Sequence, residues 1–250
     1  MGFRVRACSL HLLASVLVLS LFFGTLYWGW YRWPGWYLAG ALHVVGIVVL
    51  VDLALGPTLT LIVANPLKPS RELTRDIAMI VVVQLLALVY GAATLWSGRP
   101  LYYTFSVSRL EMVAASDIGA GEIARARREN PALAPYWYSR PRWIWAPLPQ
   151  DSDQAAQIVR STLAGGPDVI QMPRLFQPWE AGLAQLRGKL VCLEAIKELS
   201  QSEQRQLRAR LGRLGVSSAQ CSSLLMWGGS RRVLVVFDPA DLRILAMLKP

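Results

Sequence analysis

Three long hydrophobic runs dominate the first hundred residues of the chain, and polar side chains interrupt them at few places. The runs cover about residues 9–28, 37–64 and 77–96. A helix crosses the hydrocarbon core of a bilayer with about 20 apolar residues, and each run reaches that length. The pattern therefore predicts a membrane region over residues 1–98 that contains three transmembrane helices.

Residues 99–250 have a different pattern, in which hydrophobic positions alternate with polar ones or recur at helical spacing. Residues 100–250 hold 19 of the 26 Lys and Arg and 13 of the 16 Asp and Glu, which is the composition of a water-soluble domain. We expect strands over 101–107, 108–114, 168–172, 190–193, 224–227, 232–237 and 242–248, and helices over 116–128, 151–164, 178–186 and 200–214. The predicted fold class is α+β, with a three-helix transmembrane N-terminal region followed by a small α+β domain over residues 99–250.

The basic residues of the short loops predict the orientation in the membrane. The N-terminus carries Arg4 and Arg6, and the loop over residues 65–76 carries three basic residues, whereas the loop between the first two hydrophobic runs carries Arg32 alone. Loops rich in Lys and Arg stay on the cytoplasmic side. We therefore expect a cytoplasmic N-terminus and, in a bacterium with two membranes, a protein of the inner membrane with a periplasmic domain after residue 98.

One carboxylate, Asp52, lies inside the second hydrophobic run, and Gly56-Pro57 follows it. An ionisable group at this depth normally faces protein or water rather than lipid, so Asp52 is expected to face a neighbouring helix. Pro57 removes one helical hydrogen bond, and the hydroxyls of Thr58 and Thr60 can help to satisfy the groups that it leaves. Two readings of Asp52 stay open: it holds the packing of a kinked helix, or it has an ion, proton or ligand role.

The third hydrophobic run carries the side chains expected to meet Asp52. Gln84, Ala87 and Gly91 recur at helical spacing, and Tyr90 lies beside them. Counted from the loop over residues 65–76, Asp52 and Tyr90 each lie about 20 Å deep, because a helix rises about 1.5 Å per residue. We predict that this face packs on the Asp52 face, with Gln84 and Tyr90 as hydrogen-bond donors. An alternative is that Tyr90 only packs.

The sequence is poor in the side chains that catalysis and metal binding need. The two histidines, His11 and His43, both lie in or near the predicted membrane region, and His11 is expected at the interface. The domain after residue 98 therefore has no Ser-His or Cys-His pair, and no Cys/His spacing typical of a metal site or phosphate-binding glycine loop occurs in the chain. We expect a protein that is not an enzyme and has no cofactor.

An aromatic segment and a pair of cysteines are further candidates in the second domain. Residues 131–150 are rich in Pro, Trp and Tyr, and an exposed form would be a docking surface, whereas a buried form would be a loop packed on the sheet. The docking candidates are Tyr136, Trp137, Trp143 and Trp145. Cys192 and Cys221 are candidates for a disulfide, because an oxidising compartment permits one.

Four segments carry a resemblance to a known family: DLALGPTLTLIVANPLKP (52–69), QLLALVYG (84–91), GRPLYYTF (98–105) and VLVVFDPADLRIL (233–245). They resemble the TfpX/TfpZ family of type IV pilin accessory proteins. The resemblance implies a three-span inner-membrane protein with a periplasmic domain that supports pilin stability, pilus assembly or surface piliation, with a type IV pilin as its partner. On this reading the intramembrane polar face contacts pilin through Asp52, Pro57, Thr58, Thr60, Gln84 and Tyr90.

Two other function classes remain as alternatives. One is a membrane enzyme that modifies pilin, for example a glycosyl transferase, and the other is a proton-coupled carrier that uses Asp52. A nucleic-acid partner is not expected, because the net charge of +10 comes without a nucleic-acid-binding motif and suits anionic lipid headgroups better.

Overall fold

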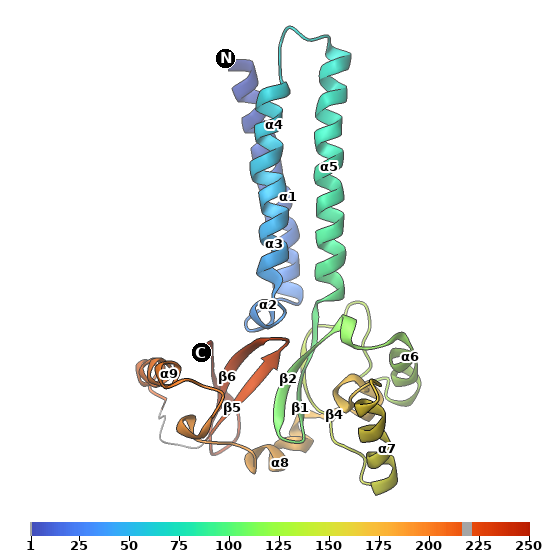
Figure 1. The fold of residues 1–250 in the computed structure, drawn as a ribbon, viewed down its shortest axis with the longest axis vertical. Coiled ribbons are helices and arrows are strands. Elements are labelled where there is room, and N and C mark those ends of the chain that lie inside the picture. The colour runs from blue at the N-terminus through green and yellow to red at the C-terminus, as the bar shows by residue number, and fades with distance from the viewer. Residues whose placement is uncertain (1, 217–221) are drawn as a thin grey trace. The chain divides into compact units, whose positions relative to one another are not determined.

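The computed structural model describes residues 2–216 and 222–250, which form two compact units. The first unit, called here the helical unit, is the segment ending at Arg32 together with Gly40–Gly98. The second, called the sheet domain, is Arg99–Pro250 together with Trp33–Ala39. The predicted α+β class is confirmed, because three apolar helices precede a mixed sheet with helices (Figure 1).

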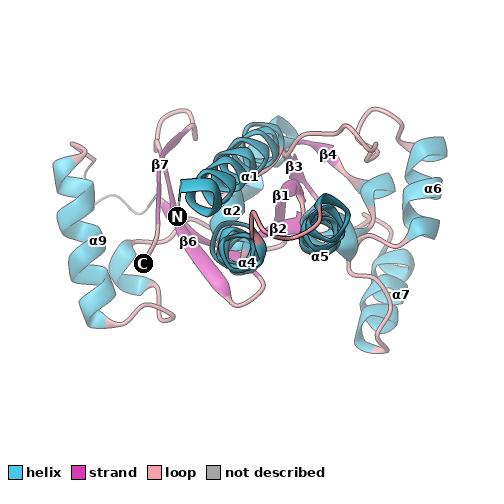
Figure 2. Ribbon diagram, turned by 90° about the horizontal axis from the view of Figure 1, so that it is seen from above, coloured by secondary structure: helices cyan, strands magenta, loops and turns pink. Residues whose placement is uncertain are grey.

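The helical unit consists of three helices that are long and apolar enough to cross a membrane. The first is α1 (Gly2–Gly29) and the third is α5 (Ser70–Ser97). The second is continuous over Ala41–Val63 and comprises α3 (Ala41–Val49), the π-helical segment η1 (Leu50–Leu55) and α4 (Gly56–Val63). The helices stand side by side, with α1 and α5 each in contact with the second helix (Figure 2).

The π-helical segment η1 lies where the sequence predicts a proline kink. Pro57 has no N–H group, and its ring would collide with the carbonyl oxygen of Leu53 in a regular α-helix. A wider π-turn before the proline relieves that collision, and π-turns inside α-helices are frequent at functional sites. The segment contains Asp52, which is therefore presented by a helical turn of unusual geometry.

The sheet domain is built on seven strands that form one sheet within the described residues, in the order β4-β3-β1-β2-β5-β6-β7. The bounds are β1 Pro100–Ser106, β2 Arg109–Ala114, β3 Arg142–Trp145, β4 Gln177–Pro178, β5 Ser223–Gly228, β6 Arg231–Phe237 and β7 Ile244–Leu248. Hairpins join β1 to β2 and β5 to β6, whose strands lie where the sequence predicts them, and β1 pairs in parallel with β3. Both faces of β5 and β6 are covered by side chains, so their sequences are almost continuously hydrophobic.

The α-helices after residue 99 include α6 (Ala120–Glu129), α7 (Ser152–Leu163), α8 (Leu183–Arg187) and α9 (Gln201–Arg213). Side-chain caps define the starts of α7 and α9. Asp151 accepts two backbone hydrogen bonds at the start of α7, and Ser200 with Glu203 forms a capping box at the start of α9. Gly215 adopts φ +70° just after α9, which confirms the predicted stop.

Three predictions about local structure in this domain are wrong. The helix expected from Ser116-Asp117 begins at Ala120, because the Asp117 side chain accepts from the Ala114 N–H and holds a 3-10 turn instead. Residues 169–171 form a 3-10 turn rather than a strand, since Asp168 caps it. Val191 makes a single bridge to Ser223 where a strand was expected over 190–193, and the chain then turns at Leu193–Ala195.

The loop between the first two apolar helices packs within the sheet domain. Leu38, in the short helix α2 (Gly35–Leu38), is 3% exposed and belongs to a core cluster with side chains of β5 and β6. The Trp33 indole N–H donates to the Met247 carbonyl oxygen of β7 at 2.9 Å, and the Arg231 guanidinium donates to the Tyr37 carbonyl oxygen at 2.8 Å. A Cβ at Gly228 would lie 2.6 Å from the Leu38 Cβ, so glycine is required for this approach.

Candidate functional site

A cluster of polar side chains in the helical unit is the candidate site, and His11 of α1 is at its centre. Nδ1 of His11 lies 2.6 Å from the Thr60 hydroxyl of α4, and Nε2 lies 2.8 Å from Oε1 of Gln84 in α5. Gln84 in turn donates through Nε2 to the carbonyl oxygen of Asp52 at 3.1 Å. One imidazole and one amide therefore connect all three apolar helices. We call His11, Asp52, Thr60 and Gln84 the polar cluster.

The hydrogen bonds of the polar cluster determine its proton positions. The Gln84 amide must present its N–H₂ group to the Asp52 carbonyl oxygen, so its oxygen faces His11. An amide oxygen only accepts, and Nε2 of His11 therefore carries a proton. In the neutral imidazole Nδ1 then accepts from the Thr60 hydroxyl, so every bond in the chain has a donor and an acceptor.

Close packing of the helices brings these groups together. Asp52, Gly56 and Thr60 recur every fourth residue, so they lie on one face of the second helix, and all three are buried. A Cβ at Gly56 would overlap the Gln84 amide, and a Cβ at Gly91 would overlap the Val48 side chain. These glycines therefore permit the short distance between the second helix and α5. Small residues have this role in membrane helix pairs, where backbones approach closely.

A cavity of about 200 Å³ adjoins the polar cluster. His11, Asp52 and Gln84 line its mainly apolar wall, and the rest of the lining comes from α1 and α5: Ala14, Ser15, Val18, Leu19, Val81, Leu85 and Leu88. Asp52 is 5% exposed and Gln84 is 8% exposed. The arrangement can offer hydrogen bonds to a group that enters between α1 and α5, in surroundings that are otherwise apolar.

The structure buries four of the six residues predicted for the intramembrane face and leaves the other two exposed. Asp52, Pro57, Thr60 and Gln84 are buried, with Gln84 in contact with Asp52 as expected. Thr58 is exposed, because it lies two residues before Thr60 and therefore on nearly the opposite side of the helix. Tyr90 is 73% exposed, so its predicted donation to the Asp52 face is wrong.

His11 is the residue that the sequence analysis missed, because it was expected at the membrane interface. Its partners are 49 and 73 residues away in the sequence, so no local pattern reveals them. A usable signal does exist: His11 and Ser15 are polar residues one helical turn apart in a run without charged residues, and both line the cavity.

The aromatic segment of the sheet domain is divided between core and surface. Trp143 and Trp145 lie in β3 and pack partly buried against the core, where Trp143 contacts Tyr103 and Trp179. Trp137 is 70% exposed and Tyr138 is 59% exposed, while Tyr136 stacks on Tyr138 with ring centroids 5.6 Å apart. Of the four predicted docking residues, the structure leaves Trp137 most exposed. The proposed pairing of Cys192 stays a prediction, because Cys221 lies outside the described residues.

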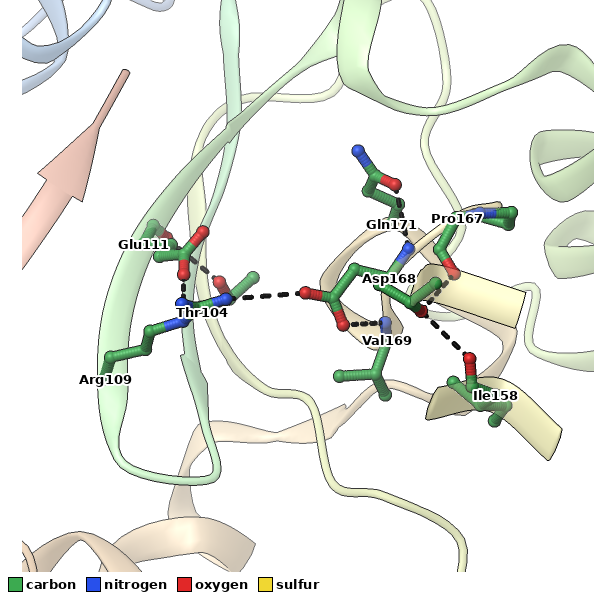
Figure 3. A network of polar contacts seen from close by, with 9 residues as sticks. Thr104, Arg109, Glu111, Ile158, Pro167, Asp168, Val169 and Gln171 are labelled. Carbon is green, nitrogen blue, oxygen red and sulfur yellow. Dashed lines mark hydrogen bonds and ion pairs between the residues drawn. The ribbon is translucent and has the colours of Figure 1, made fainter. Parts of the chain in front are cut away.

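A polar network at the tip of the β1–β2 hairpin is structural in character (Figure 3). Arg109 forms ion pairs with Glu111 and, at 3.5 Å, with Asp168. Asp168 accepts from the Val169 N–H at 2.6 Å and so caps the 3-10 turn that follows α7. Burial raises the pKa of Glu111, while Arg109 opposes the rise and the Asp168 charge adds to it. The network joins the hairpin to this turn and contains no nucleophile paired with a base.

Comparison with known proteins shows what the chain is similar to. The chain is similar to fimbrial assembly proteins. It is 22% identical to the serogroup E1 fimbrial assembly protein of Dichelobacter nodosus over 94% of this chain and 91% of the relative, and 26% identical to the serogroup I protein over 80% and 74%. The protein of serogroups C1 and C2 from the same organism is 28% identical over 50% of this chain and 95% of its own length. No protein-family model and no solved structure matched the chain. The names of these relatives support a role in pilus biogenesis.

Proposed function

We propose that the chain is a membrane-embedded accessory factor of type IV pilus biogenesis that acts without catalysis and binds pilin. The names of the relatives support the pilus role. The observation that carries the proposed mechanism is the polar cluster, since it adjoins a cavity between helices that are otherwise apolar. On this proposal the protein resides in the bacterial inner membrane, with its N-terminus in the cytoplasm and its sheet domain in the periplasm.

The physical argument concerns what a polar group contributes inside a bilayer. Lipid tails are as apolar as leucine, so two helices gain little from hydrophobic contact in the membrane. A hydrogen bond between helices contributes on average about 0.6 kcal/mol and at most about 1.7 kcal/mol. A pilin helix that enters beside α1 and α5 would find an acceptor in the Asp52 carboxylate, because both ring nitrogens of His11 already have partners, and it would be held in the membrane until assembly begins.

The sheet domain supplies a second, soluble surface for the same partner. Trp137 and Tyr138 are exposed, and aromatic residues of this kind dominate the energetics of protein interfaces. On the proposal they contact the pilin head while the polar cluster contacts its helix. Two contacts on one chain raise the effective concentration of the second contact once the first has formed.

Site-directed photocrosslinking in cells tests the membrane contact. A photoreactive residue at Leu88, which lines the cavity, is expected to capture pilin. The matched control is Val89, the next residue of α5, which is 64% exposed and points about 100° away around the helix. Equal capture of pilin at both positions, or none at Leu88, would contradict the proposed contact.

Piliation of a deletion strain tests the function itself. The strain is expected to lose surface pili, and the wild-type gene is expected to restore them. Restoration by Thr58→Val should be complete, whereas Gln84→Leu should restore pili poorly because it removes both hydrogen bonds of the amide. Unchanged piliation in the deletion strain would refute the accessory role.

The polar cluster also favours a second candidate, because His11 and Asp52 line one cavity and a proton-coupled carrier needs titratable groups in contact. Asp52→Asn separates the two candidates, since the amide keeps the shape and one acceptor oxygen but cannot titrate. An accessory factor should keep most of its piliation, while a carrier should lose its activity.

The mass of pilin tests the enzyme alternative. If the protein modified pilin, the added mass would be absent from pilin of the deletion strain.

A further inference from the structure

A second cavity, of about 630 Å³, lies in the sheet domain between α6 and α7. This is within the range of about 300–1,000 Å³ that is usual for binding pockets. Its wall combines charged, amide and apolar side chains: Glu122, Arg125, Pro149, Gln154, Gln157, Ile158, Ser161, Pro167, Met172 and Arg174. We call it the α6–α7 cavity.

Two arginines meet at one carboxylate in the wall of this cavity. Glu122 is 9% exposed; its Oε1 pairs with Arg125 Nη1 at 3.2 Å and its Oε2 lies 3.4 Å from Arg174 Nε. The contact with Arg174 is an ion pair without hydrogen-bond geometry. Oε2 of Glu122 and Nε of Arg174 are both buried and therefore lack a hydrogen-bond partner. One carboxylate faces two guanidinium groups, and the local charge is therefore positive. A guanidinium has five N–H donors, so Arg125 and Arg174 together have more N–H donors than the Glu122 carboxylate can accept.

The α7 side of the cavity is lined by uncharged polar groups in a row. Gln154, Gln157 and Ser161 are spaced three and four residues apart, so they lie on one face of the helix. The row is about 10 Å long at a rise of about 1.5 Å per residue, which equals about three residues of extended chain. Ile158 is the residue of α7 that is buried, so this helix rests on the domain through a small apolar contact.

We propose that the α6–α7 cavity binds an extended peptide segment that carries a carboxylate. The carboxylate pairs with Arg125 and Arg174, where the charge is positive. The amides of Gln154 and Gln157 and the hydroxyl of Ser161 bind the peptide backbone, because each of them both donates and accepts. Met172 and the two prolines contact the aliphatic parts of the segment. An acidic sugar shares the carboxylate but has no backbone that matches a row of this length.

Binding to the purified full-length protein in detergent tests the proposal with three probes. They are acetyl-Ala-Glu-Ala-amide, its neutral counterpart acetyl-Ala-Gln-Ala-amide, and galacturonate as the acidic sugar. The Glu peptide is expected to bind at least about tenfold more tightly than the Gln peptide, as the loss of one charge-assisted hydrogen bond predicts. Galacturonate is expected to bind more weakly than the Glu peptide.

Three substitutions connect binding to the cavity. Arg174→Gln is expected to remove most of the preference for the Glu peptide over the Gln peptide. The Arg174→Gln substitution also leaves Glu122 with one ion pair fewer, so a second variant is needed. Gln157→Ala leaves the ion pairs intact and should weaken the binding of both peptides. Arg160→Gln is the matched control, since Arg160 is an exposed arginine of α7 outside the cavity wall.

The outcomes either support or overturn the proposal. A preference for the Glu peptide that Arg174→Gln reduces and Arg160→Gln leaves unchanged, together with weaker binding of both peptides to Gln157→Ala, supports it. Equal binding of the two peptides, tighter binding of galacturonate, or no binding of the Glu peptide at millimolar concentration overturns it. None of these results depends on piliation, so they are independent of the proposed pilus role.

Discussion

Two threonines in α4 provide a matched test of the polar cluster. Thr60 is 2% exposed and lies 2.6 Å from Nδ1 of His11, whereas Thr58, two residues earlier, is exposed. Thr→Val replaces a hydroxyl with a methyl group of similar size, so Thr60→Val and Thr58→Val change the same atoms in the same helix. We predict that Thr60→Val destabilises the helical unit and that Thr58→Val leaves it nearly unchanged.

The magnitude follows from the hydrogen bond that is lost. Interhelical hydrogen bonds in membrane proteins contribute about 0.6 kcal/mol on average, and leaving Nδ1 of His11 unsatisfied adds a desolvation penalty of about 1 kcal/mol. Thr60→Val is therefore expected to cost about 1–2 kcal/mol, or roughly a factor of 5–30 in the equilibrium constant for unfolding. Thr58→Val should change the free energy of unfolding by less than about 0.5 kcal/mol.

Reversible unfolding in mixed detergent micelles measures both variants, and a double-mutant cycle assigns the effect to the pair. In a His11→Leu background, Thr60→Val should cost much less than in the wild-type protein, since its partner is already absent. Equal destabilisation by Thr58→Val and Thr60→Val, or full additivity with His11→Leu, would refute the bond between the two side chains and with it the polar cluster.

The remaining predictions concern packing, a pH-sensitive cap and the loop that packs in the sheet domain. Gly56→Ala is expected to cost about 1–3 kcal/mol because its Cβ overlaps the Gln84 amide, whereas Gly46→Ala, with open space around it, should not destabilise the protein in the same unfolding assay. Hydrogen bonds from the Ser200 backbone and side chain and then from Arg232 lower the pKa of Glu203 from 4.5 to about 2. Because the folded state lowers this pKa, the stabilisation is present above pH 4.5 and is lost as the pH falls toward 2. Glu203→Gln should therefore lower the free energy of unfolding by about 1 kcal/mol at pH 7, after solvent screening, and by much less near pH 2. Thermal unfolding at the two pH values measures the difference. Trp33→Phe, which removes the N–H that donates to Met247, should destabilise the sheet domain by about 1 kcal/mol, and unchanged hydrogen exchange in β7 would contradict that contact.

Local signals were sufficient for much of the fold. Each of these features depends on a few neighbouring residues: the three apolar runs, the capping box at Ser200, the cap at Asp151 and the hairpin turn at Gly229-Ser230. Their physics is local as well, because helix caps and tight turns are satisfied by hydrogen bonds within about four residues. The same applies to Asp52, whose burial follows from the cost of placing a carboxylate in lipid.

Tertiary structure decided which polar groups meet. Thr60 rather than Thr58 bonds to His11 because of how the second helix is rotated about its axis. The partners of His11 also depend on which helices face α1. Likewise, Trp143 and Trp145 became part of a strand because β1 offers a parallel partner, and the loop at Trp33–Ala39 joined the sheet domain through Leu38. These contacts join residues that are tens to hundreds of positions apart, and their free energy depends on the packing of whole helices and sheets, which no short stretch of sequence encodes.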